Sequence, residues 1–411
     1  MASFSERVIE IVKSIPEGKV MSYAEVAARA GSPKAVRAVG SVMKANHDAD
    51  VPCHRVVRKS GDIGEYNRGK DAKKSRLESE GVILDGNRIV PGIPKIVTIG
   101  GGTGSFVILS ALKRFPVDIT AIISMADDGG STGILRDQYG VLPPGDIRKA
   151  IVALSESSDT LRALFNYRFK EGSLKGHNFG NLFLAVLEKV TGDFSAAVSE
   201  ASSVLNIKGK VIPVTLADTT LHARLASGRV LHGESVIDLG RNFRSPISSV
   251  WLDPEVMVNP EAVRAVKEAD LLVICPGSPY TSVIPNFLVS GFREAVAASA
   301  AKKVYIMNLM TKNGETDGMK ASDFIKSIEK YAGEGIIDYV IANNKMPSRS
   351  TLDLYKKERA RPILPPRKRS GGPVVVKGDF IARGELIRHD PEGKLAEVLL
   401  SLMISDRKPR P

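Results

Sequence analysis

The stretch Lys95–Gly104, KIVTIGGGTG, decides the fold of the larger part of this chain. Its apolar half, Ile96–Ile99, predicts a short buried strand of a parallel sheet, and the glycines after it predict a turn into a helix over Ser105–Phe115. Glycines let backbone N–H groups approach an anion, and the start of a helix adds unpaired N–H groups and a positive dipole. The stretch is therefore a candidate phosphate site.

Strands that end in polar or glycine-rich turns recur further along the chain. The predicted strands are Asp118–Met125, Asp270–Cys275, Lys303–Leu309 and Ile337–Ala342, and the predicted helices include Pro260–Glu268, Phe287–Ala300 and Gly393–Ile404. Strands that alternate with helices indicate an α/β fold with a doubly wound, Rossmann-like parallel sheet. Two excursions interrupt this pattern, a mostly helical insertion over Thr160–Leu205 and a small hairpin over Leu221–Asp238.

In such sheets ligands bind at the carboxyl ends of the strands. The turn ADDGGSTG at Ala126–Gly133 offers Asp127 and Asp128 to hydroxyl groups or a metal ion. The turn PGSPYTS at Pro276–Ser282 offers amides and hydroxyls, and Asn308 follows another strand. Each turn alone is also typical of ordinary loop chemistry. Their recurrence at five strand ends favours one shared binding site.

Composition bounds the remaining possibilities. A length of 411 residues suggests two or more domains, and the formal net charge of +12 favours polyanionic partners. The two cysteines, Cys53 and Cys275, are too few for a disulfide framework, and Cys275 is expected to be a core residue. No apolar run is long enough to span a bilayer, and the N-terminal segment predicts an amphipathic helix. We therefore expect a cytoplasmic protein without a membrane partner.

Residues before the linker predict a separate small module. Helices over Ser22–Ala30 and Lys34–Asn46, joined by a turn with glycine and proline, have the layout of a helix-turn-helix. The segment VPCHRVV at Val51–Val57 then places a thiol beside His and Arg, which favours a reactive thiolate. A buried structural cysteine is the alternative.

Several motifs in this module resemble the alkylguanine-DNA alkyltransferases, the methylated-DNA-protein-cysteine methyltransferases, which have a helix-rich, winged-helix-like domain. The matching residues are Ser22-Tyr23, Pro33-Lys34-Ala35, Arg37–Gly40, Asn46, Pro52–Val56, Gly61, Gly64–Tyr66 and Glu80-Gly81. The resemblance implies that the protein takes an alkyl group from guanine in double-stranded DNA, once per molecule.

The resemblance also implies residue roles. Cys53 resembles the alkyl acceptor, His54 the base that activates it through a water, and Glu80 the carboxylate that orients the histidine. The DNA contacts implied are Tyr23, which crowds the target phosphate, Arg37, which enters the base stack, Asn46, which holds the turn before the thiol, and Arg55. The loop departs from the family at Asn67 and Arg68, where a small residue and glycine are usual.

The larger part resembles the gluconeogenesis factors, nucleotide-sugar-binding proteins related to the phospholactate transferases. GGGTG, DDGGSTG, PPGDIR, GHNFGNL, PGSPYTSVIPN and NLMTKNGET carry this resemblance over Lys95 to about Asp353. It implies a UDP-sugar ligand and a regulatory role in carbon metabolism, cell-wall supply and cell shape. The implied nucleotide-sugar contacts are Gly100, Gly101, Gly102, Thr103, Gly104, Asp127, Asp128, Asn181, Gly277, Ser278 and Asn308.

The sequence thus predicts an alkyltransferase-like domain over 1–84, a linker over 85–94 and a nucleotide-sugar-binding domain over 95–411, with a basic, proline-rich segment near 355–368. We expect alkylated DNA and a nucleotide sugar as partners, and we allow for a homodimer. The alkyltransferase reaction requires no cofactor.

Two alternatives stay open. In the first, the larger domain is a magnesium-dependent transferase that acts on a nucleotide-diphosphate donor, with Asp127 and Asp128 as metal ligands. In the second, the whole chain is a regulator that binds damaged DNA without reacting.

Overall fold

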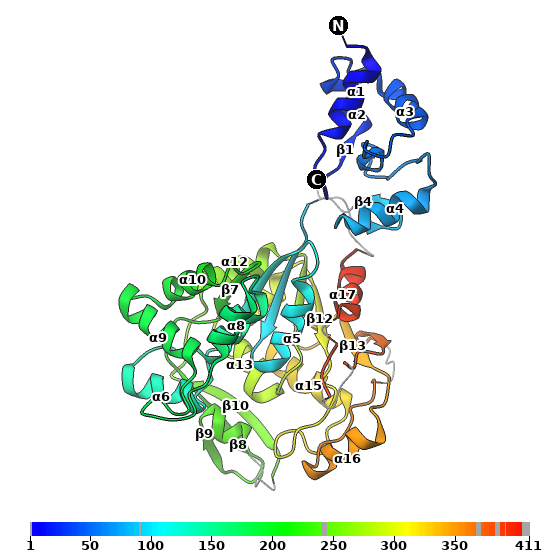
Figure 1. The fold of residues 1–411 in the computed structure, drawn as a ribbon. Coiled ribbons are helices and arrows are strands. Elements are labelled where there is room, and N and C mark those ends of the chain that lie inside the picture. Colours follow the sequence, from blue (N-terminus) through cyan, green and yellow to red (C-terminus); the bar gives the residue numbers. More distant parts are fainter. Residues whose placement is uncertain are drawn as a thin grey trace. The chain divides into compact units, whose positions relative to one another are not determined.

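The computed structural model describes residues 2–89, 92–239, 245–366, 371–382, 387–390 and 392–404 (Figure 1). The chain divides into two compact units. One comprises Met1–Ile93 and Leu400–Pro411, and the other comprises Pro94–Leu399. No helix among the described residues is long and apolar enough to cross a membrane.

The first unit is helical with very short strands. Its elements are α1 (Phe4–Lys13), β1 (Met21–Ser22), α2 (Tyr23–Arg29), α3 (Val36–Ala45), the one-turn helix Cys53–Arg55, β2 (Val56–Val57), α4 (Lys70–Ser79), β3 (Leu84–Asp85) and β4 (Arg88–Ile89). Val8 and Val12 of α1 share a core with Val26 of α2 and Val39 of α3. The two predicted helices joined by a turn are thus present, and the apolar face of each packs inward.

The linker prediction needs correction over its first half. β3 and β4 form an antiparallel hairpin, and the backbone N–H of Ile89 donates to the carbonyl oxygen of Gly61 at 2.7 Å. The Asp85-Gly86 pair allows the turn, because Gly86 has a φ of 58°. Asp-Gly between two short apolar runs is a hairpin signal that the linker interpretation overlooked.

The larger unit contains the predicted doubly wound sheet. Its seven strands are β5 (Lys95–Gly100), β6 (Asp118–Ile123), β7 (Lys210–Pro213), β11 (Leu271–Ile274), β12 (Lys302–Ile306), β13 (Tyr339–Asn343) and β14 (Val374–Gly378). They lie in the order β14-β13-β12-β11-β5-β6-β7, and all neighbours are parallel (Figure 1). The α/β fold class is confirmed.

Helices connect and extend this sheet. They are α5 (Gly102–Leu112), α6 (Gly130–Tyr139), α7 (Gly145–Leu154), α8 (Asp159–Asn166), α9 (Phe179–Thr191), α10 (Phe194–Val204), α11 (Glu234–Asp238), α12 (Pro260–Glu268), α13 (Ile284–Phe287), α14 (Phe292–Ala298), α15 (Ala321–Ala332), α16 (Arg349–Lys357) and α17 (Lys394–Ile404). The predicted helix over 287–300 is wrong in its first part, because the left-handed Gly291, with φ 89°, separates α13 from α14.

The predicted hairpin excursion is larger than expected. β8 (Thr220–Leu225) pairs on one side with β9 (Val230–His232) and on the other with β10 (Ile247–Asp253), which makes a three-stranded antiparallel sheet. Its third strand comes after the predicted excursion ends, so local pattern alone did not include it.

The strand order fixes where a ligand site is expected. The chain enters the sheet at β5, continues to β6 and β7 on one side, and then returns to β11 on the other side. Ile99 of β5 is in register with Ile274 of β11, so the turns after these strands leave the sheet side by side. This is the topological switch point, where doubly wound sheets bind ligands.

Candidate functional sites

Cys53 begins the one-turn helix of the first unit, directly after Pro52. Its side chain is buried, and its Sγ accepts a hydrogen bond from Nδ2 of Asn46 at 3.2 Å. Burial raises the pKa of the Cys53 thiol, while the Asn46 hydrogen bond and the charge of Lys73 oppose this rise. A base is therefore needed to produce the thiolate.

The neighbouring imidazole is held in a position suited to that task. Nε2 of His54 lies 2.7 Å from Oε1 of Glu80. Burial alone would raise the pKa of Glu80, but hydrogen bonds from Arg55 and His54 lower it to about 2. Because the ionised carboxylate accepts a hydrogen from Nε2, Nδ1 keeps its lone pair. Nδ1 is buried and has no hydrogen-bond partner among the described residues.

Arg55 belongs to this network. Its Nε and Nη2 donate to the two oxygens of Glu80 at 2.8 and 2.7 Å, and its Nη1 donates to the carbonyl oxygen of Ile15 at 2.7 Å. Only 16% of its side chain is exposed. All three nitrogens thus bind within the unit, and two of them hold the carboxylate behind His54. The expected DNA contact of Arg55 stays a prediction.

A pocket of about 790 Å³ opens beside Cys53. Among its lining residues are Tyr23 and Ala24 of α2, Arg37, Gly40 and Met43 of α3, and Arg58, Tyr66 and Asn67 of the following loop. Tyr23 and Arg37, two of the predicted DNA contacts, thus lie around the thiol, and Arg37 is exposed. A volume of this size is typical of small-molecule sites and accommodates one nucleobase.

Two polar residues support the thiol in ways that the sequence analysis missed. Lys73 is fully buried, its Nζ donates to the carbonyl oxygen of Val56 at 2.6 Å, and burial lowers its pKa to about 8. Asn67 donates to the carbonyl oxygen of Asn46. The sequence of α4 contains several charged residues, and nothing in it separates Lys73 from the others. Only the tertiary packing shows that Lys73 is the buried one.

In the larger unit, the glycine loop and the turn after β11 meet. A Cβ at Gly104 would lie 1.7 Å from the carbonyl oxygen of Pro276, so only glycine permits this approach. The N–H of Gly102 donates to Oδ2 of Asp146 at 2.7 Å. A Cβ at Gly101 would lie 2.6 Å from the same oxygen. The loop predicted to bind phosphate thus receives a carboxylate from the start of α7. Gly100 is buried and Thr103 exposed beside it.

The two aspartates after β6 differ in their surroundings. Asp127 is half-buried, and burial together with the nearby charge of Asp146 raises its pKa. Asp128 instead accepts the backbone N–H groups of Glu234 and Ser235 at 3.0 and 2.7 Å, and so caps the start of α11. Asp127 therefore lies near Asp146, whose carboxylate contacts the glycine loop, while Asp128 has a structural partner.

Asn181 also has structural partners. Its Oδ1 accepts from Nε of Arg148 at 2.9 Å, and its Nδ2 donates to Oγ1 of Thr132 at 3.4 Å. Asn308 holds the turn after β11, because its Nδ2 donates to the carbonyl oxygen of Gly277 at 2.7 Å. The structure thus brings Asn308, Gly277 and the glycine loop to one edge, with Asn181 in a buried network near Thr132.

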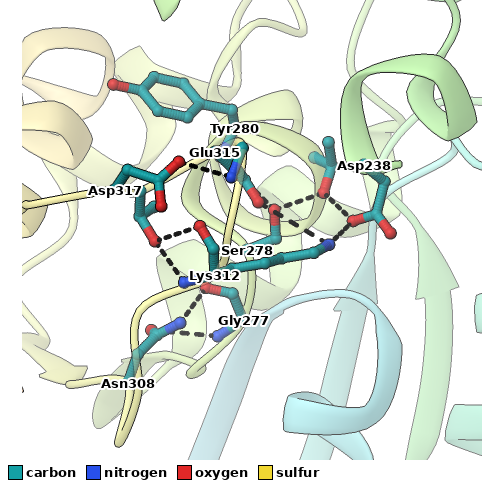
Figure 2. Close-up of polar contacts among 11 residues, drawn as sticks. Asp238, Gly277, Ser278, Tyr280, Asn308, Lys312, Glu315 and Asp317 are labelled. Atoms are coloured by element: carbon teal, nitrogen blue, oxygen red, sulfur yellow. Dashed lines mark hydrogen bonds and ion pairs between the residues drawn. The ribbon is translucent and has the colours of Figure 1, made fainter. Parts of the chain in front are cut away.

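A polar cluster ties the turn after β11 to two other segments (Figure 2). Oγ of Ser278 donates to Oε1 of Glu315 and accepts from Oγ1 of Thr281 at 2.5 Å. Glu315 is buried, burial raises its pKa, and its Oε2 has no hydrogen-bond partner among the described residues. Nζ of Lys312 lies 3.8 Å from that oxygen and also pairs with Asp238 at the end of α11.

The sequence analysis missed Asp146, Lys312, Glu315 and Asp238. The first three lie in the motifs PPGDIR and NLMTKNGET, so the signal was present. The sequence pattern did not reveal the direction in which these side chains point after each turn.

The expectation for Cys275 agrees with the structure. Its side chain is fully buried at the end of β11, and burial raises its pKa to about 12. Within the described ranges, no group of three His, Cys, Asp or Glu side chains is arranged to hold a metal ion.

Comparisons with known proteins give relatives for both units. The family model 2-phospho-L-lactate transferase CofD matches residues 96–380, and that of the 6-O-methylguanine DNA methyltransferase DNA-binding domain matches residues 3–82. The gluconeogenesis factor of Bacillus subtilis is 43% identical over 315 residues, covering 75% of this chain and 98% of the relative. A putative gluconeogenesis factor of Nostoc sp. is 43% identical over 325 residues, which cover 78% of this chain and 70% of the relative.

A crystal structure of a Bacillus halodurans protein is 42% identical, with a TM-score of 0.72, and covers 75% of this chain and 100% of its own. Through residues 96–380 the chain therefore belongs to the 2-phospho-L-lactate transferase CofD family, and it carries an alkyltransferase-like DNA-binding domain at residues 3–82.

Proposed function

We propose that the first unit removes an alkyl group from O6 of guanine in double-stranded DNA and keeps it on Cys53. The observation that carries this proposal is Nδ1 of His54, which has no hydrogen-bond partner in the described part of the chain. It belongs to a ring that Glu80 fixes, one residue from a thiol beside a pocket that can accommodate a nucleobase. A thiol with a raised pKa needs such a base.

The reaction follows from these positions. His54 takes the thiol proton through a water, and the Cys53 sulfur attacks the alkyl carbon. The S–C bond forms as the O6–C bond breaks, and the guanine oxygen keeps the electron pair and is neutralised by a proton. Because the thioether is not hydrolysed, each protein molecule reacts once. Arg37 fills the gap that the flipped base leaves in the stack, and Tyr23 turns the target phosphate.

Mass spectrometry after incubation with an O6-methylguanine duplex tests this proposal. We expect one methyl group on the peptide that contains Cys53 and none in the Cys53→Ser variant. Binding to the duplex with an unmodified Cys53 would instead favour the DNA-damage-binding regulator.

For the larger unit we propose binding of a nucleotide sugar, with a UDP-sugar as the first ligand to test. The supporting observation is the contact between the glycine loop and the turn after β11, at the switch point of the sheet. In this arrangement the diphosphate replaces the Asp146 carboxylate at the Gly102 amide, and Lys312 supplies a positive charge. Such a unit would sense the supply of nucleotide sugars and would adjust cell-wall synthesis and cell shape to it.

Calorimetry with UDP- and GDP-linked sugars on the full chain tests this second proposal. Saturable binding without product supports the sensor. Product formation that requires magnesium supports the transferase, an alternative that the family name favours and in which Asp127 is the remaining candidate metal ligand. Absence of binding by the whole panel would contradict both.

A further inference from the structure

The three-stranded sheet β10-β8-β9 presents a row of aromatic side chains on one face. Burial alternates along β8, where Leu221, Ala223 and Leu225 are buried and His222 lies on the opposite face. His222 is in register with His232 on β9 and with Trp251 on β10. The row therefore crosses all three strands on the face that points away from the core.

The two imidazoles of this row contact each other through their Nδ1 atoms. Nδ1 of His222 lies 2.8 Å from Nδ1 of His232, and the ring planes are perpendicular with centroids 4.7 Å apart. At this separation only one of the two Nδ1 atoms carries a hydrogen. The pair thus consists of a donor and an acceptor, and the two nitrogens face each other.

One of the rings is also held from its other side. His222 stacks on Trp251 with centroids 5.5 Å apart and an angle of 17° between the planes. The guanidinium of Arg224 lies 5.8 Å from the same indole. Because the buried neighbours of β8 anchor the strand, His222 is positioned before any ligand arrives.

We propose that His222 and His232 bind a divalent transition-metal ion through their Nδ1 atoms, with Cu(II) and Ni(II) preferred to Zn(II). Two nitrogens about 2.0 Å from a metal and at right angles to each other are about 2.8 Å apart, whereas tetrahedral zinc separates them by about 3.3 Å. The observed separation fits the right-angled geometry of Cu(II) and Ni(II).

Binding requires one proton to move. The hydrogen shared by the two Nδ1 atoms leaves through water while Nε2 of the same ring takes one up, so both rings stay neutral. Water completes the coordination, because the described residues place no third His, Cys, Asp or Glu in the group. The positively charged guanidinium of Arg224 lies over the Trp251 ring of this row. Its charge repels a metal ion and so weakens the affinity of the two histidines for the metal. The site is independent of both proposed functions.

Fluorescence provides a specific test, because Trp251 is the single tryptophan of the chain. Cu(II) and Ni(II) quench a nearby indole, so the untagged full-length protein, first stripped with EDTA, is titrated with each chloride salt. We expect saturable quenching by Cu(II), weaker binding of Ni(II), competition by Zn(II) only at higher concentration, and two nitrogen ligands in the Cu(II) EPR spectrum.

The variant His232→Ala keeps Trp251 and its stacked partner, so the reporter is unchanged. We expect the Cu(II) dissociation constant to rise by about tenfold or more. His47→Ala, which removes an exposed histidine of the first unit, is the matched control and leaves the constant unchanged. Equal affinity in His232→Ala, or a spectrum with fewer than two nitrogens, would overturn the proposal. Circular dichroism confirms that each variant is folded.

Discussion

At the scale of single residues, the first unit depends on a carboxylate that does not touch the thiol. Glu80 joins His54 to Arg55, and its pKa of about 2 keeps it ionised at any working pH. In Glu80→Gln the uncharged amide no longer stabilises a protonated imidazole. We therefore expect the single-turnover rate of Cys53 alkylation to fall by about 100-fold. Rapid-quench kinetics with a methylated duplex measure this rate.

The matched control is Glu78→Gln, an exposed residue in the last turn of α4, the helix that ends just before Glu80. It removes the same charge from the unit, so it separates the net-charge effect on DNA binding from the effect on the reaction. An equal loss of rate in the two variants would contradict the role assigned to Glu80.

Residue identities were predictable where a motif fixes them. Cys53, His54 and Glu80 were assigned from sequence, and in the structure hydrogen bonds join Cys53 to Asn46 and His54 to Glu80. The ion pair of Arg55 with Glu80 could not be predicted, because the side chains of adjacent residues can point in opposite directions and a one-turn helix has no simple period. Lys312 and Glu315 were not assigned, since their partners Asp238 and Ser278 are more than thirty positions away in sequence.

At the scale of elements, the close approach of α5 to the turn after β11 gives a sharp prediction. The variant Gly104→Ala would place a methyl group 1.7 Å from a backbone oxygen of Pro276, which no rotamer change relieves. We expect the larger unit to lose about 3 kcal/mol or more of unfolding free energy. Thr103→Ala, at the exposed neighbouring position, should cost less than about 0.5 kcal/mol. Urea denaturation compares the two.

The short helix α11 gives a prediction about pH. Glu234 is largely buried, and burial together with Asp238, Asp127 and other acids raises its pKa to about 8. Between its usual value near 4.5 and about 8, the folded state holds a proton that the unfolded state releases, so the stability of the larger unit falls as pH rises through this window. In Glu234→Gln we expect a smaller fall, seen in unfolding midpoints at pH 5 and about pH 8.

Glu200→Gln, at an exposed position of α10, serves as the control and should keep the wild-type pH dependence. A parallel fall in Glu234→Gln and wild type would show that other groups cause the effect.

The sequence predicted whether a segment is a helix or a strand better than it predicted where that segment begins and ends. The strands of the parallel sheet are continuous apolar runs, and five predicted strands match β5, β6, β11, β12 and β13 within a few residues. The third strand β10 could not be assigned, because its partner β8 lies more than twenty residues earlier and register depends on packing. The break at Gly291 likewise reflects a left-handed residue that helical periodicity does not reveal.

At the scale of the whole molecule, the change from helical pattern to alternating strands predicted two domains, and the chain does form two compact units. The hydrogen bonds of Cys53, His54 and Glu80 described above are made within residues 1–89, whereas those of Ser278 and Glu315 are made within the larger unit. Two sites influence each other only if a ligand at one makes different contacts in two states of the other.

We therefore expect no coupling between the two activities of the full chain. A saturating nucleotide sugar should leave the rate of Cys53 alkylation within about twofold, because an effect of 1 kcal/mol would already change it about fivefold. Since binding free energies are reciprocal, calorimetry with the alkylated protein gives a second measurement, and its affinity for the sugar nucleotide should match that of the unreacted protein. A several-fold change in both measurements would reveal a linkage between the first unit and the larger unit, and the joining of the two in one chain would then have an energetic basis.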